Sequence, residues 1–63
     1  MKINGENTTE TFTSMEELLL ARGYNVKYVA VECNGRILPK TKYSTYIPDA
    51  GDVIEIVSFV GGG

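Results

Sequence analysis

The feature that most constrains this chain is an apolar strand near its end that runs directly into three glycines. The strand is nearly apolar on both of its rows: Val53, Val57 and Phe59 with Glu55 on one, and Ile54, Ile56 and Val60 with Ser58 on the other. Strands covered on both sides show this pattern, whereas edge strands carry charge or proline. We therefore predict a central strand, with Ile54 and Ile56 facing a helix because Glu55 stays hydrated more easily on the opposite row.

The residues after this strand predict a flexible tail over 60–63. Gly61, Gly62 and Gly63 have no side chains to pack, and glycine loses the most conformational entropy on ordering. Three extended residues reach roughly 10 Å, which is enough to carry the carboxylate of Gly63 into a narrow site on a partner. The alternative interpretation is a disordered tail or a cloning remnant. Next to the tail, Val57, Phe59 and Val60 are either half-covered by neighbours or part of an apolar docking patch.

Composition indicates one small folded domain over residues 1–63. With 43% apolar and 22% charged residues the chain is globular, and no apolar run is long enough to cross a membrane. We see no secretory signal pattern and expect a cytoplasmic location. The single cysteine, Cys33, cannot form an intrachain disulfide. With no histidine, we expect no metal site and no histidine-based catalytic triad.

Charge argues against a nucleic-acid partner. The net charge is −2, although four of the six cations fall in one quarter of the sequence: Lys27, Arg36, Lys40 and Lys42. We interpret this cluster as a solvated basic face.

The first third of the chain predicts a hairpin followed by a short helix. Asn4-Gly5 suits a two-residue turn after a strand at 1–3, and the β-branched run at 8–12 is expected to pair back, with Phe12 as a core anchor. Ser14 and Glu17 form a capping box, in which Glu17 would accept from the Ser14 amide. Gly23 is expected to end a helix of about eight residues whose buried face carries Met15, Leu18 and Leu19.

The middle of the chain predicts a second hairpin. Residues 28–33 alternate, Asn34-Gly35 suits another tight turn, and residues 36–38 return before Pro39. Cys33 falls on the Val29 and Val31 row, where a small buried residue fits better than a reactive thiol. The polar connection over 40–48 is expected to lie on the domain through three apolar side chains: Tyr43, Tyr46 and Ile47.

Two hairpins around one helix, closed by a central last strand, form the ubiquitin-like β-grasp arrangement. This is an α+β fold with a mixed sheet of four to five strands packed on one short helix. Three stretches in order, 29–40 (VAVECNGRILPK), 51–57 (GDVIEIV) and 59–63 (FVGGG), resemble motifs of the ThiS family, the sulfur carriers of thiamine biosynthesis. Val57-Ser58 stands where the molybdopterin-synthase small subunits usually carry two prolines, which favours the thiamine branch.

The resemblance implies a carrier and not an enzyme. In such a carrier, an adenylating enzyme of the ThiF type would use ATP to activate the Gly63 carboxylate, and a sulfur donor enzyme would convert it into a thiocarboxylate for a thiazole synthase of the ThiG type. Gly61 and Gly62 would be recognised by the partner, no cofactor would be bound by the chain itself, and the free protein would be a monomer. Three alternatives stay open: a molybdopterin-type sulfur pathway, a ubiquitin-like modifier joined to lysine, and a non-covalent interaction domain.

Overall fold

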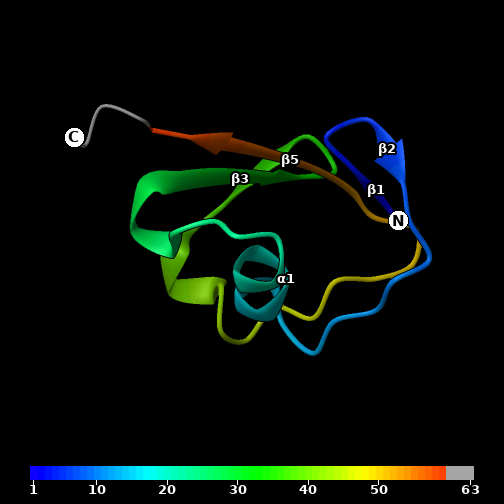
Figure 1. Ribbon diagram of the computed structural model, residues 1–63, viewed down its shortest axis with the longest axis horizontal. Helices are drawn as coiled ribbons and strands as arrows, with labels where there is room; N and C mark the ends of the chain where they lie inside the picture. The colour runs from blue at the N-terminus through cyan, green and yellow to red at the C-terminus, as the bar shows by residue number, and fades with distance from the viewer. Residues whose placement is uncertain (60–63) are drawn as a thin grey trace.

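A five-stranded mixed sheet packed on one helix makes up the described part of the chain (Figure 1). The computed structural model describes residues 1–59, so the predicted tail over 60–63 lies outside the described residues. The strand order is β2-β1-β5-β3-β4, with β1 and β5 parallel and the other neighbours antiparallel. The elements are β1 (Lys2–Ile3), β2 (Glu6–Asn7), α1 (Met15–Ala21), β3 (Val29–Cys33), β4 (Arg36–Leu38) and β5 (Val53–Ser58). This architecture confirms the predicted fold.

The last strand occupies the centre of the sheet, as predicted. β5 lies between β1 and β3, and its two rows separate cleanly by burial. Ile54 and Ile56 are buried on the side of α1, whereas Val53, Glu55 and Val57 are exposed on the opposite face. The row assignment made from Glu55 is therefore correct.

Both Asn-Gly turns bind β5 in addition to closing their own hairpins. Asn4 and Asn34 have φ values of 50° and 56°, and the glycines after them 85° and 83°, which is the backbone of a two-residue hairpin turn. The Asn4 side-chain oxygen accepts from the Ile56 amide at 2.7 Å, and the Asn34 side-chain oxygen accepts from the Val53 amide at 2.9 Å. The turn residues thus extend the hydrogen bonding of the central strand beyond its short neighbours.

The position predicted for the second strand is wrong. β2 is Glu6–Asn7, directly after the turn, and not the run at 8–12. A two-residue turn places Glu6 opposite Ile3 and Asn7 opposite Lys2. Thr8 then meets the first residue, its amide donating to the Met1 carbonyl at 2.9 Å, so β1 has no partner left for residues 9–12. Phe12 lies outside any strand and is half-buried against the core, which keeps its role as an apolar anchor.

Helix α1 begins and ends close to the predicted signals. The Ser14 hydroxyl accepts from the Glu17 amide at 3.0 Å, while the Glu17 carboxylate accepts from the Thr13 amide at 2.6 Å, not from Ser14 as predicted. At the other end, Gly23 has a φ of 82°, and Tyr24 donates to the Leu19 carbonyl, which is the Schellman arrangement. With seven helical residues, α1 depends on its packing for stability.

The core lies between α1 and the inner face of the sheet. Its buried members are Ile3, Met15, Leu18, Leu19, Val29, Val31, Tyr43, Ile54 and Ile56. The connection over 40–48 lies on the domain, since the carbonyls of Tyr43 and Tyr46 accept from the first amides of α1, at Glu16 and Met15. Ile47 does not take part as predicted, because 67% of it is exposed.

A buried carboxylate fixes the start of β5. Asp52 is only 6% exposed, and its two oxygens accept from the Tyr46 hydroxyl at 2.6 Å, the Asp49 amide at 2.9 Å and the Asn34 side-chain amide at 2.9 Å. Burial alone would raise the pKa of Asp52, but these hydrogen bonds outweigh it and hold the pKa below its usual value. The hydrogen bond to Asp52 raises the pKa of Tyr46, and the hydrogen bond to Cys33 and burial raise it further.

We expect Asp52→Asn to destabilise the domain in a pH-dependent way. A carboxyl whose pKa is lower in the folded than in the unfolded chain stabilises the fold above its unfolded pKa, about 3.9, and loses that contribution as the pH falls through the folded value. The variant should lose about 1–3 kcal/mol of unfolding free energy at pH 7. Its deficit should shrink at pH 3. Urea unfolding at both pH values measures this, with Glu6→Gln on exposed β2 as the control; an equal deficit at both would contradict the assignment.

Candidate functional site

The outer row of β5 presents apolar side chains at the point where the strand leaves the sheet. Val57 is 59% exposed and Phe59 is 51% exposed, so the rest of residues 1–59 covers each of them only about halfway. These values fit the half-covered interpretation, and both side chains still present apolar surface to a partner. Their role in docking stays a prediction, and Val60, the third residue of the predicted patch, lies outside the described residues.

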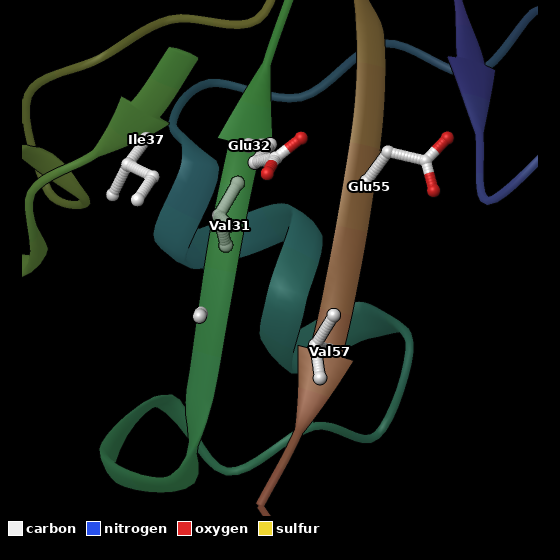
Figure 2. A pocket seen from close by; sticks show the side chains of 6 residues that line it. Val31, Glu32, Ile37, Glu55 and Val57 are labelled. Atoms are coloured by element: carbon white, nitrogen blue, oxygen red, sulfur yellow. The ribbon is translucent and has the colours of Figure 1, made fainter. Parts of the chain in front are cut away.

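The residues beside Val57 form a shallow hollow on the outer face of the sheet (Figure 2). Its volume is about 470 Å³, and it is lined by Ala30, Val31, Glu32, Ile37, Glu55 and Val57. Strand register explains the grouping: Val57 pairs with Ala30, Glu55 with Glu32, and Glu32 with Ile37. Three neighbouring strands thus bring apolar and acidic side chains together on one face.

The exit from β5 is held by a short 3₁₀ helix, η1 (Val26–Tyr28). The Phe59 amide donates to the Tyr28 carbonyl at 2.6 Å. The Lys40 ammonium donates to the carbonyls on either side, those of Val26, Lys27 and Val29, at 3.0, 3.2 and 2.8 Å. A cation suits the end of a helix, where carbonyls lack partners. Lys40 is exposed, as the predicted solvated basic face requires, but its ammonium also binds backbone carbonyls, a contact that the sequence did not indicate.

Cys33 has the environment of a structural residue. It lies on the Val29 and Val31 row, half-buried, with its sulfur 3.2 Å from the Tyr46 hydroxyl. Burial raises the pKa of the thiol, and nearby Asp52 adds to this while the Tyr46 hydrogen bond opposes it. A raised pKa leaves little thiolate at neutral pH, which agrees with the prediction that Cys33 is not a reactive group.

Two features are absent from residues 1–59: a cluster of metal ligands and a helix that could span a membrane. In this range no three Cys, Asp or Glu side chains gather in a way that would hold a metal ion. None of the helices described here is long and apolar enough to span a bilayer.

The residues expected to carry the chemistry lie beyond the described range. Gly61, Gly62 and Gly63 fall in 60–63, so their proposed roles in recognition and activation stay predictions. The structure describes the residues that lead to them. β5 is the central strand, the Phe59 amide is hydrogen-bonded where the strand ends, and an exposed sheet face lies beside it.

Sequence reasoning missed the acidic pair Glu32 and Glu55. Alternation within residues 28–33 and the row assigned to Glu55 were predicted, but neither glutamate was assigned a partner. That they lie directly opposite each other depends on the register between β3 and β5, which neither strand reveals alone.

A mixed sheet packed on one helix, with its last strand central, defines a β-grasp domain. The model of the ThiS family matches residues 1–63. The crystal structure of thiamine biosynthesis protein ThiS from Geobacter metallireducens superposes with a TM-score of 0.76 at 32% identity, covering 98% of this chain and 96% of that one. The chain therefore belongs to the ThiS family, the sulfur-carrier family that its motifs indicated.

Two further relatives differ in the share of their own length that this chain covers. The thiazole synthase of Paramagnetospirillum magneticum is 42% identical over 62 residues, which is 97% of this chain but only 19% of the synthase. This chain thus spans about a fifth of that relative. The uncharacterized protein ycf40 of Porphyra purpurea is 41% identical over 66 residues, covering the whole of this chain and 90% of its relative.

Proposed function

We propose that this protein carries sulfur as a thiocarboxylate on Gly63 and delivers it for thiazole formation in thiamine biosynthesis. The observation that carries the proposal is a sequence match to proteins named thiazole synthase. The match covers 97% of this chain but only a segment of each synthase. Joining two domains in one polypeptide raises the effective concentration of one at the other, which favours domains that act together. Membership of the ThiS family supports the same pathway.

The proposed activation step needs a partner enzyme. An oxygen of the Gly63 carboxylate attacks the α-phosphate of ATP and pyrophosphate leaves. Sulfur supplied by a donor enzyme at the oxidation level of sulfide then attacks the acyl carbon, AMP leaves with the shared oxygen, and the thiocarboxylate remains. ATP is bound by the adenylating enzyme of the ThiF type, which orients the reactants and excludes water. The chain supplies the reacting carboxylate and no catalytic group. We place this reaction in the cytoplasm, where the sulfur donor's thiols stay reduced.

Glycine suits the residues next to the reacting carboxylate. A side chain at Gly61 or Gly62 would widen the segment that enters the enzyme and restrict its dihedral angles. The amides and carbonyls of both residues remain available for hydrogen bonds from the partner. We therefore propose that Gly61 and Gly62 are recognised through their backbone.

The exposed residues at the strand exit are the proposed docking contact for the adenylating enzyme. Phe59 borders a small hollow of about 160 Å³ together with Pro39 and Ala30. An aromatic side chain beside a concave surface is the kind of residue that dominates binding energy in interfaces. Val57 and Val60 would extend the contact on either side.

We expect Phe59→Ala to weaken binding to the adenylating enzyme by 10-fold or more while lowering the thermal midpoint only slightly. The reason is that about half of Phe59 is exposed in the free protein, so truncation removes little buried contact area. Titration calorimetry and thermal unfolding measure the two effects. Ile47→Ala, which truncates another exposed apolar residue outside this face, is the matched control. Unchanged affinity with a large loss of stability would place Phe59 in the core instead.

The proposed function is tested by mass spectrometry. Incubated with an adenylating enzyme, ATP and a sulfur donor, the protein should gain the mass of one oxygen-to-sulfur exchange, located on Gly63. Omitting ATP is the control. A protein that stays at its original mass with active enzymes would contradict the proposal.

A further inference from the structure

The outer face of the sheet carries a pair of like charges that the fold itself does not need. Glu32 and Glu55 are direct partners across the antiparallel strands β3 and β5, and both are exposed. Like charges directly opposite each other destabilise a sheet. Figure 2 shows both side chains on this face, with the Glu55 carboxylate turned away from β3. Within residues 1–59 the one ion pair is Arg22 with Glu10, so neither carboxylate of the pair is neutralised by a cation in this range.

Apolar side chains surround the acidic pair. Ile37 lies beside Glu32 and is 74% exposed, and Val57 lies beyond Glu55 along the strand. Together with Ala30 they complete the hollow of about 470 Å³. A partner that covers these apolar groups would also remove water from the two carboxylates. Because a desolvated carboxylate is costly unless it is paired, the partner must bring a cation to this place.

We propose that this face binds an arginine side chain of the adenylating enzyme, which lies between the carboxylates of Glu32 and Glu55. Apolar groups of the enzyme cover Ile37 and Val57 at the same time. Arginine fits better than lysine because its planar guanidinium presents five donors and serves two carboxylates at once. This inference rests on the proposed function and deepens it by stating the chemistry of the partner's surface.

Position along the chain favours the adenylating enzyme as the occupant. Gly63 lies six positions after Val57, a span of at most roughly 20 Å when extended. An enzyme that takes the Gly63 carboxylate into its active site therefore has a surface within reach of this face. Charge-steered encounter would also bring the partner to this face at a higher rate.

Charge argues against two other occupants. A second copy of this chain docked through the same face about a twofold axis would bring four carboxylates together. A nucleic-acid backbone would be repelled by the same pair. The free protein should accordingly be a monomer with respect to this face.

The test uses Glu32→Gln, Glu55→Gln and the double variant, each titrated into the adenylating enzyme at low and high salt. Each single change should weaken binding about 10-fold, the double variant should bind at least as weakly as either, and the salt dependence of binding should decrease. The thermal midpoint of the free variants should stay the same or rise by about 1–4 °C, since repulsion is relieved. Glu6→Gln makes the same charge change on exposed β2 and should leave affinity unchanged.

The outcomes separate this inference from the proposed function. If the wild-type protein is thiolated and the double variant binds as tightly as Glu6→Gln, the proposed arginine site at Glu32 and Glu55 is wrong and the carrier function stands. If the double variant unfolds at a clearly lower temperature, the glutamates stabilise the fold and the argument from repulsion is overturned. If the wild-type protein neither binds the adenylating enzyme nor becomes thiolated, the proposed function and this inference both fail.

Discussion

Deleting Gly63 will abolish thiolation of the chain while leaving its fold unchanged. The deletion moves the terminal carboxylate back by roughly 3.5 Å, several times the positional tolerance of about 0.5 Å for a reacting group in an enzyme site. A misplacement of about 1 Å already costs on the order of 100-fold in rate, so we expect a loss of at least that size. Mass spectrometry of the reaction with enzyme, ATP and sulfur donor measures it, and thermal unfolding checks the fold.

A chain extended by one alanine after Gly63 is the matched variant. It keeps every residue of the carrier but pushes the carboxylate past the α-phosphate of ATP and adds a Cβ at the reacting end. We expect the same loss of thiolation. If either the shortened or the extended protein is thiolated at the wild-type rate, the carboxylate of Gly63 is not the reacting group.

Ile56→Asp will unfold the domain. Ile56 lies in the central strand with its side chain in the core, and the variant would bury a carboxylate with no cation beside it. The cost is on the order of 5 kcal/mol, whereas a chain of this length has a total stability of only about 3–9 kcal/mol. Circular dichroism should show no cooperative thermal transition.

The next residue of the same strand provides the control. Val57 is exposed on the opposite face, so Val57→Asp places an identical charge in water and should keep a cooperative transition. If Ile56→Asp melts close to the wild-type temperature, the row assignment of β5 is wrong. If both variants unfold, β5 does not tolerate a second carboxylate beside Glu55 on either row, and burial is not the deciding factor.

Patterns within single segments predicted most of the fold. The double apolar row of β5 indicated its central place, and Ser14 with Gly23 bounded α1, because each signal depends on neighbouring residues alone. The position of β2 was missed for a physical reason: a two-residue strand has no periodicity to read. The turn at Asn4-Gly5 was the better guide, since its length alone fixes which residues pair.

The candidate site was predicted only in part, because its geometry depends on contacts between distant segments. Exposure of Val57 and Phe59 followed from the row assignment. The backbone contacts of Lys40 were not predicted, since its ammonium binds carbonyls 11 to 14 residues earlier in the chain. The opposition of Glu32 and Glu55 likewise required the register of two strands. No local pattern encodes either contact.

The pairing of the first strand with the last has a consequence for how the protein is made. Lys2 pairs with Val53, 51 residues further along the chain, so the middle of the sheet cannot close until β5 has left the ribosome. Closing so long a loop is an entropically costly step, and it slows folding relative to a domain built from local contacts. Until then the inner face of the growing chain is open to proteases and to other chains. Because the strand that completes the core is also the strand that leads to Gly63, an adenylating enzyme that requires an ordered strand exit would act only on carriers that have finished folding.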